Sequence, residues 1–186
     1  MSFDVNEFRS QLKFDGARPN MFKVRFLNAG DVRFDSRTEF FVNAAEIPPE
    51  QIGIIEIPYF GRRIKIPGDR TFPQWTVQIM NDEDFAIRGA LENWSNMMND
   101  HSSNLRLNKH YLSDAEVIQM SKTGQEIRTY KFRNVFPSDV SPIALSWGTN
   151  DTIQEYTTTF QYDYWEVVQS ATPTTGASAV ASNIGN

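Results

Sequence analysis

The chain has 186 residues, and its 18 Lys and Arg against 23 Asp and Glu give a formal net charge of −5, which argues against a general affinity for nucleic acid or anionic lipid. It contains no Cys, which excludes disulfides, thiolate metal clusters and a cysteine nucleophile. No apolar run approaches the ~20 residues that a membrane-spanning helix needs, and the first residues lack the pattern of a signal peptide. We therefore expect one soluble domain with no membrane partner.

The N-terminal residues predict a short helix followed by a strand. Asp4 can cap a helix over residues 5–13, with Phe8 and Leu12 on one side. Residues 22–26 then alternate aromatic or aliphatic side chains with basic ones. A period of two is typical of a half-buried β-strand.

The middle of the chain predicts a projecting hairpin and a further strand. Residues 54–58 and 63–66 flank Gly61, which can adopt the positive φ of a tight turn. We expect them to form a hairpin or a projecting arm, placed near residues 58–70. Residues 75–79 alternate Trp, Val and Ile with polar residues and predict the strand that follows.

One longer helix is expected after the acidic residues 81–84. Apolar residues spaced by four, three and four positions form one stripe there, namely Ile87, Leu91, Trp94 and Met98. Acidic residues favour the positive end of the helix dipole, so Asp82 or Asp84 is the expected cap.

The last third of the chain predicts a hairpin and an aromatic strand. Residues 115–121 and 125–133 flank a Lys-Thr-Gly turn at 122–124, and residues 156–164 carry Tyr, Thr, Phe, Tyr and Tyr at the even positions. These elements predict a mainly β fold. We expect an antiparallel β-sandwich or partial barrel with one flanking α-helix that covers an open end or face.

Catalytic and metal-binding patterns are absent from the sequence. His101 and His110 lie nine positions apart with no HExxH pattern, and residues 81–84 lack the spacing of a calcium loop. The sequence contains no GxSxG, P-loop or GxGxxG motif. We expect a protein that is not an enzyme and that has no catalytic residue, metal site or cofactor.

Four cations and two aromatic residues stand close together in the expected arm: Arg62, Arg63, Lys65 and Arg70 beside Tyr59 and Phe60. Such a set can grip a nucleic acid through phosphate contacts and base stacking, as a nucleic-acid binding module using Arg62 to Arg70 would. The alternative is a charged projecting loop whose cations pair with carboxylates in the chain or on a partner. We favour the second interpretation, because the rest of the chain supplies no basic face.

Uncharged residues fill the C-terminal end of the chain. Residues 169–186 contain no charge and are rich in Ala, Ser, Thr and Gly, which is typical of a flexible tail. We divide the chain into a domain over 1–166 and a C-terminal tail over 167–186. A β domain with an aromatic arm and no catalytic cluster suits self-assembly by strand pairing or arm exchange.

Several stretches are similar in order and spacing to one known family. They are Ala-Arg-Pro-Asn-Met-Phe at 17–22, Ile-Pro-Gly-Asp-Arg-Thr-Phe-Pro-Gln-Trp-Thr-Val-Gln-Ile-Met-Asn-Asp-Glu at 66–83, Phe-Pro-Ser-Asp-Val at 136–140, Leu-Ser-Trp at 145–147 and Thr-Phe-Gln-Tyr-Asp-Tyr-Trp-Glu at 159–166. Over about residues 17–166 the chain resembles the tail tube proteins of contractile-tailed bacteriophages. The chain departs from that pattern around residues 30–37, at 100–112 and beyond 166.

The resemblance implies a structural protein of the virion tail that is assembled in the host cytoplasm. It implies hexameric rings, in which strands of all six subunits join one continuous inter-subunit β-barrel, and rings stacked into a tube inside a contractile sheath. The implied partners are further copies of the chain, the tail sheath protein, baseplate and tail-terminator proteins, and the tape measure protein and genome DNA in the lumen. The inner tube of a protein-delivering contractile injection system is the alternative within the same architecture.

For such a tube, the expected arm is the candidate contact between subunits or between rings. The candidate residues are Tyr59, Phe60, Gly61, Arg62, Arg63, Lys65, Gly68, Asp69 and Arg70. We expect the arginines to meet carboxylates of a neighbouring copy and Phe60 to enter an apolar slot. A basic bore would retain DNA, so we expect a lumen lined by Asp, Glu, Gln, Thr and Ser.

Overall fold

The computed structural model describes residues 4–11, 16–27, 29–34, 36–103 and 111–168. Within these ranges the helices are α1 (Val5–Gln11), α2 (Thr38–Phe41) and α3 (Ala86–Met98). The strands are β1 (Phe22–Phe26), β2 (Val42–Ala45), β3 (Gln51–Tyr59), β4 (Arg62–Thr71), β5 (Trp75–Met80), β6 (Ser113–Met120), β7 (Glu126–Val140), β8 (Glu155–Gln161) and β9 (Tyr164–Val168). None of the helices in the described part of the chain is long and apolar enough to cross a membrane.

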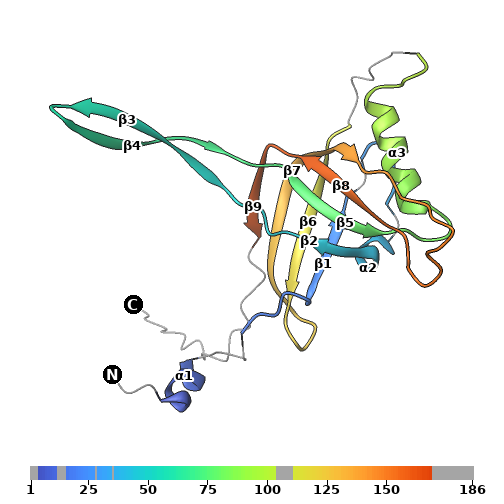
Figure 1. Cartoon of the computed structure of the whole chain (residues 1–186), viewed down its shortest axis with the longest axis horizontal. Helices are drawn as coiled ribbons and strands as arrows, with labels where there is room; N and C mark the ends of the chain where they lie inside the picture. The colour runs from blue at the N-terminus through green and yellow to red at the C-terminus, as the bar shows by residue number, and fades with distance from the viewer. Residues whose placement is uncertain (1–3, 12–15, 28, 35, 104–110, 169–186) are drawn as a thin grey trace, which may run out of the picture.

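One antiparallel sheet forms the body of the molecule. Its strands follow the order β1-β6-β7-β8-β5-β2, and β9 pairs with β7 beside this path. The long strand β7 serves both halves of the sheet, because its first half pairs with β6 and β9 and its second half pairs with β8. Asn134, with φ 57°, lies between the two halves. The curved sheet wraps around a core, with α3 at one end (Figure 1).

The expected mainly β, antiparallel fold is confirmed. The two ends of the strand path are β1 and β2, and α2, which the sequence did not predict, contacts both of them. No ladder of hydrogen bonds joins β1 to β2 among the described residues, so closure of a barrel is not seen within the single chain.

Aromatic rings fill the core. Phe160 lies at the centre, with its ring centroid 5.1 Å from that of Phe26 and 5.5 Å from that of Trp75. Trp75 stacks on Phe132 at 4.3 Å, and Trp94 of α3 lies 6.3 Å from Phe160. The aromatic rings of the core therefore come from β1, β5, β7, β8 and α3, which share one interior.

The main helix confirms the predicted stripe but not the predicted start. Ile87, Leu91 and Trp94 are buried, as their spacing required. The N-cap is Phe85, with φ 52°, and no acidic residue lies in the first turn. Phe85 therefore occupies the N-cap position that was expected for Asp82 or Asp84, although the Asp84 carboxylate accepts the N–H of the first helical residue.

The two carboxylates before α3 have other partners. Arg37 donates to Asp82 at 3.2 Å and to Asp84 at 2.9 Å. The Asp84 carboxylate also accepts the backbone N–H of Ala86 at 3.1 Å. The acidic stretch therefore fastens the segment before α2 to the beginning of α3, a long-range role that local spacing does not reveal.

The predicted strand over 156–164 is wrong at its C-terminal end, where the structure contains two strands. β8 ends at Gln161, the chain bends at Tyr162 and Asp163, and β9 begins at Tyr164. Asn134 donates to the Asp163 carboxylate at 2.5 Å and holds the bend. β8 then pairs with the second half of β7 and β9 with its first half. The alternating aromatic pattern of residues 156–164 therefore spans a corner, at which the chain passes from one half of the sheet to the other.

The other expected strands are present, several of them with longer bounds, and the expected N-terminal helix is described over Val5–Gln11. β3 and β4 extend the expected hairpin to residues 51–71, and β7 continues to Val140. In α1, the Asp4 carboxylate accepts the N–H of Asn6 at 3.0 Å, while Phe8 is exposed. The structure does not describe Leu12, His110 or residues 169–186; β9 ends at Val168.

Candidate functional site

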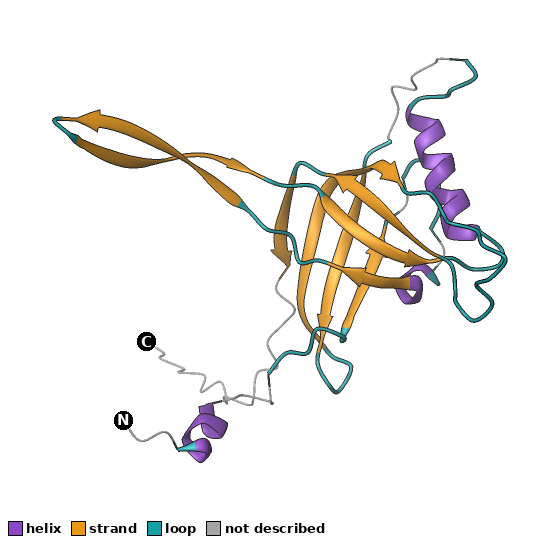
Figure 2. Ribbon diagram, in the orientation of Figure 1, coloured by secondary structure: helices purple, strands orange, loops and turns teal. Residues whose placement is uncertain are grey.

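The β3–β4 hairpin projects from the body of the molecule as a separate two-stranded sheet (Figure 2). Its turn consists of Phe60 and Gly61, with φ values of 41° and 78°, between the paired residues Tyr59 and Arg62. A two-residue turn with both φ values positive matches the twist of a hairpin. An aromatic residue rarely adopts this left-handed conformation. Because Phe60 is the first residue of the turn, its ring lies at the tip of the hairpin, where it is 91% exposed.

One face of the hairpin is made of isoleucines. Ile55 lies opposite Ile66, and Ile57 lies opposite Ile64, so that all four side chains point to the same side. We call these four residues the isoleucine face. Their exposed fractions are 54% for Ile55, 44% for Ile57, 51% for Ile64 and 42% for Ile66. In the single chain this apolar surface faces solvent.

The other face of the hairpin carries charge. Glu56 lies opposite Lys65, and Pro58 lies opposite Arg63. The Glu56 carboxylate accepts a hydrogen bond from Arg63 at 2.7 Å and lies 3.9 Å from Lys65 Nζ. The charged side chains of this face are exposed to water.

A β-bulge shapes the base of the hairpin. The register shifts between Ile52 and Ile54, so that Gly53 lies opposite two residues of β4. A Cβ atom on Gly68 would lie 3.3 Å from the backbone of Gly53. The two glycines therefore allow the strands to approach closely at the point where the ribbon twists.

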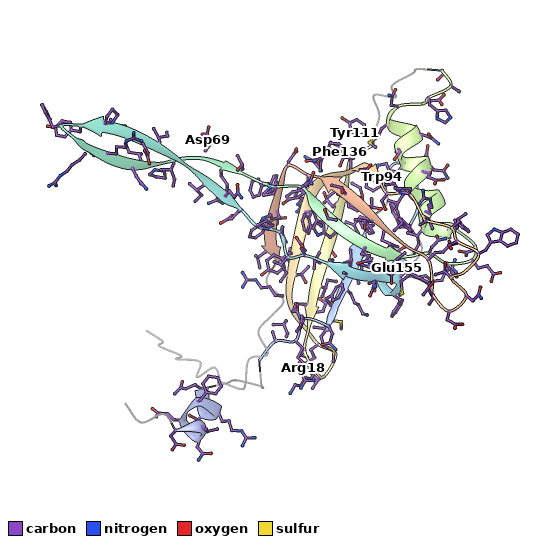
Figure 3. All side chains as sticks on the ribbon, viewed as in Figure 1. Arg18, Asp69, Trp94, Tyr111, Phe136 and Glu155 are labelled. Atoms are coloured by element: carbon purple, nitrogen blue, oxygen red, sulfur yellow. The ribbon has the colours of Figure 1, made fainter. Side chains whose placement is uncertain are left out.

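The structure places all nine predicted site residues in this hairpin. Tyr59, Phe60, Gly61 and Arg62 form its tip, and the rings of Tyr59 and Phe60 lie 4.7 Å apart, edge to face. Gly68 lies in the bulge, and Figure 3 shows Asp69 on the hairpin beyond the body of the molecule.

Most of the predicted cations already have carboxylate partners within the chain. Arg63 and Lys65 pair with Glu56, and Arg70 lies 3.5 Å from Glu50. Among the residues that the structure describes, Arg62 has no ion-pair partner. This pairing agrees with the charged-loop interpretation and leaves little free positive charge for a nucleic acid.

The isoleucine face was not predicted from the sequence. Ile55, Ile57, Ile64 and Ile66 are visible in the sequence as an alternating pattern, but such a pattern predicts a strand with one face buried against the same chain. Only the structure shows that nothing in the described residues covers these side chains. Large exposed apolar patches mark interaction sites.

A second exposed apolar group lies in the connection between β7 and β8. Trp147 is fully exposed, and Leu145 and Ile153 lie near it in sequence and are also exposed. Trp and other large apolar side chains are enriched among the residues that dominate binding energy in interfaces.

Two groups in the described part of the chain have strongly shifted pKa values, and each shift has a structural cause. Burial raises the pKa of Tyr156 to about 12, and its hydroxyl has no hydrogen-bond partner in the described part of the chain. Hydrogen bonds from Ser103 and Ser102 lower the pKa of Asp100 to about 2 on the exposed surface after α3.

Comparison with known families gives one match that spans most of the chain. The family described as phage tail tube protein matches residues 5–168. The chain is 29% identical to the tail tube protein gp19 of Enterobacteria phage T4 over 155 residues, which cover 82% of this chain and 92% of that protein. It is 22% identical to the tail tube protein of Serratia phage KSP90 over 165 residues, which cover 85% and 93% of the two chains.

Solved structures share the fold at lower identity. A chain in the tube-terminating cap of the anti-feeding prophage superposes with a TM-score of 0.62 at 18% identity, over 83% of this chain and 92% of that one. A chain in the sheath–tube complex of an extracellular contractile injection system superposes with a TM-score of 0.60 at 17% identity, over 91% of this chain and all of that one.

Proposed function

This chain belongs to the phage tail tube protein family, and on that premise we propose that its copies form hexameric rings that stack into a hollow tube. It is a tail tube subunit of a contractile phage tail, a structural component of the virion rather than an enzyme. What remains to be explained is how one chain builds a tube from its own surfaces.

The isoleucine face carries this proposal. Burying one isoleucine fully contributes about 1.5–3 kcal/mol relative to leaving it exposed, and the hairpin presents four of them on one side. A two-stranded ribbon is also marginally stable alone, so the arm gains most from a partner. A neighbouring copy in the same ring or in the next ring covers this face.

The hairpin tip supplies the specificity of the contact. Phe60 enters an apolar slot of the neighbouring copy, and Arg62 pairs with a carboxylate there. The candidate contact includes Tyr59, Gly61, Arg63, Lys65, Gly68, Asp69 and Arg70, which hold these two side chains in place or flank them. Copies related by one repeated rotation produce a closed ring, and stacking of rings produces the tube.

Strand pairing between copies completes the ring. A free strand edge invites pairing with another chain, and a closed barrel removes the edge. The strands at the ends of the path, β1 and β2, and the outer edge of β9 are the edges that this chain offers. Strands from six copies then form one continuous barrel around the bore.

The tube has partners outside and inside. Solved relatives occur in a sheath–tube complex, in a baseplate and in a sheath/tube terminator, which supports sheath, baseplate and terminator partners for this chain. The relatives that match by sequence are phage proteins, so we propose genome DNA, with the tape measure protein before it, as the content of the bore.

A pair of substitutions tests the isoleucine face. Ile57→Thr with Ile64→Thr keeps β-branched side chains on directly opposed residues while making the face polar. We expect tubes of the unmodified protein in negative-stain images and rings or monomers only for the double variant. Urea unfolding of the monomer is expected to change by less than about 1 kcal/mol, because both side chains are exposed.

The matched control is Ile54→Thr. Ile54 lies in the same strand and is 65% exposed, but it lies opposite Pro67 on the other face. We expect this variant to form tubes as the unmodified protein does. Tubes of normal length from the double variant would refute the isoleucine face as the contact.

A further inference from the structure

A surface groove of about 750 Å³ runs along α3. Its lining combines small and apolar side chains with charged ones, and includes Asp31, Val32, Phe85, Gly89, Ala90 and Met97. Between Phe85 and Met97 the helix rises by about 18 Å, so the groove is long enough to receive several side chains of an incoming segment. We call it the α3 groove.

Both walls of the α3 groove are fixed by the fold of the single chain. One wall is a tight turn, in which the backbone groups of Ala29 and Val32 exchange two hydrogen bonds, at 3.1 and 2.9 Å. Ala29 is fully buried and anchors this turn in the core, while Asp31 is exposed. The other wall is α3, whose buried stripe holds it against the core. A partner therefore meets a surface that needs no ordering, which lowers the cost of binding.

Gly89 lies inside α3, at a position where the chain itself does not need a glycine. Glycine is less favourable than alanine inside a helix, because it loses more conformational freedom on folding. Gly89 does not have a positive φ. Apart from the backbone of its own helix, a Cβ atom at this position would have no heavy atom of the described residues within 4 Å. The missing side chain therefore leaves room for a group from outside the chain.

The tip of the hairpin carries groups that suit this groove. Phe60 is 91% exposed, and the ring of Tyr59 packs edge to face against it. Neither Arg62 at the tip nor Asp31 in the groove has an ion-pair partner among the residues that the structure describes. Arg33 also lines the groove, so this wall offers one charge of each sign. A guanidinium and a carboxylate that are unpaired in the single chain can pair between two copies.

The hairpin tip and α3 lie at opposite ends of the molecule (Figure 1). The tip therefore cannot reach the groove of its own chain. A protrusion at one end that fits a recess at the other end gives a head-to-tail contact between copies. Repetition of such a contact produces closed rings or open stacks, which are the two arrangements that the proposed tube combines.

From these observations we propose that the α3 groove receives the hairpin tip of a neighbouring copy. The Phe60 ring lies over Gly89, where the missing side chain allows it to approach the helix, and Arg62 pairs with Asp31. This inference rests on the proposed tube, because it identifies the apolar slot and the carboxylate that the tip contacts there.

Paired cysteines test this contact, because the chain contains no Cys of its own. Arg63→Cys places a thiol beside the tip, and Asn93→Cys places one in the α3 groove. A short bis-maleimide can join the two thiols only between copies, since the hairpin tip and α3 lie at opposite ends of one chain. Each chain has one thiol of each kind, so we expect denaturing gels of treated tubes to show trimers and longer products.

The matched control replaces Asn93→Cys with Glu92→Cys. Glu92 is the preceding residue of α3 and is exposed, but it does not line the groove. We expect several-fold less product longer than a dimer from Arg63→Cys with Glu92→Cys. Equal amounts from the two pairs, or no long product from either, would overturn the α3 groove as the contact, with the tube itself intact. Absence of tubes from the unmodified protein would overturn the proposed function instead.

A substitution at Gly89 gives a second test that needs no cross-linking. Gly89→Leu fills the groove, and because leucine favours a helix, the urea midpoint of the monomer is expected not to fall. We expect a several-fold lower yield of tubes, counted in negative-stain images. Glu92→Leu adds the same side chain on the exposed side of α3 and is expected to give the yield of the unmodified protein. Similar yields from the two variants, whether high or low, would overturn the proposal.

Discussion

The core of the main sheet and the β3–β4 hairpin use the same kind of strand for opposite purposes. Ile79 of β5 and Ile57 of β3 both occur in strands where apolar residues recur at every second position, yet Ile79 is fully buried and Ile57 is 44% exposed. The difference is what covers the apolar face. Alternation specifies a strand with one apolar side, but it does not specify whether the cover is the same chain or another copy.

This difference separates folding from assembly. Core residues contribute their burial when the single chain folds, whereas the isoleucine face, which is exposed in the single chain, would contribute its burial only in the proposed assembly. Substitutions in the core are therefore expected to change the free energy of unfolding, and substitutions in the hairpin are expected to change tube yield.

The largest expected effect comes from the centre of the core. Phe160 is fully buried and contacts the rings of Phe26, Trp75 and Trp94. Phe160→Ala is expected to lower the free energy of unfolding by about 3–5 kcal/mol, because the cavity removes these contacts. Urea unfolding followed by tryptophan fluorescence measures the loss, and tubes are expected to be absent because folded subunits are scarce.

Phe60→Ala is the matched control, in which a phenylalanine of the hairpin rather than of the core is removed. The Phe60 ring is almost fully exposed, so its loss is expected to change the free energy of unfolding by less than about 0.5 kcal/mol while reducing tube yield. Equal destabilisation by the two substitutions would contradict the separation of folding from assembly.

An intermediate effect is expected from the arginines at the hairpin tip. Arg62→Ala with Arg63→Ala removes the proposed carboxylate contact of Arg62 and the exposed ion pair between Arg63 and Glu56. Exposed ion pairs contribute about 0–1 kcal/mol, so the melting temperature of the monomer is expected to stay nearly constant. Sedimentation at normal salt is expected to show that tubes do not elongate.

The single variant Arg63→Ala sharpens this prediction. Arg63 has a partner in its own hairpin, whereas Arg62 has none among the described residues, so the single variant is expected to retain most of the tube length. Full-length tubes from the double variant would show that the arginines do not carry the contact.

The smallest effect is expected at Tyr156, which lies in the core away from the hairpin. Its hydroxyl is buried without a partner in the described residues, so Tyr156→Phe is expected to leave tube yield unchanged and to alter the free energy of unfolding at neutral pH by less than about 1 kcal/mol. Burial raises its pKa to about 12, because the charged phenolate is poorly solvated there.

The same tyrosine predicts a pH dependence. Because the pKa is higher in the folded state than in the unfolded state, the stabilisation is complete below about pH 10 and is lost as the pH rises towards about 12. Urea unfolding across this range is expected to show a decline that is smaller by about 1–2 kcal/mol in Tyr156→Phe. An identical decline in both proteins would show that Tyr156 titrates normally.

Much of the fold could be predicted because its signals are local. β1, β5 and the buried stripe of α3 follow from periodicity within a few residues, and Gly61 marks the hairpin turn. The division between β8 and β9 could not be predicted, because Asn134, distant in sequence, holds the bend at Asp163. The position of Asp82 and Asp84 before α3 depends in the same way on Arg37.

The location of the candidate site could be predicted from the sequence, but the apolar nature of its largest exposed face could not. From the sequence, the contact was assigned to Tyr59, Phe60 and the cations, since charged and aromatic residues are visible without a structure. The isoleucine face was missed because period-two isoleucines are expected to be buried by their own chain. The pairing of Arg63 and Arg70 with Glu56 and Glu50 emerged only when the register between β3 and β4 was known.

By itself the sequence determined most of the strands, the main helix, the position of the arm and the family to which the chain belongs, because periodicity, turn residues and motif order are properties of neighbouring positions. The tertiary structure decided which apolar strand faces are covered and which are left open, and it placed α3 at the end of the molecule opposite the hairpin tip. Those outcomes depend on which distant strands pair, and pairing is set by packing of the whole chain rather than by any short segment of it.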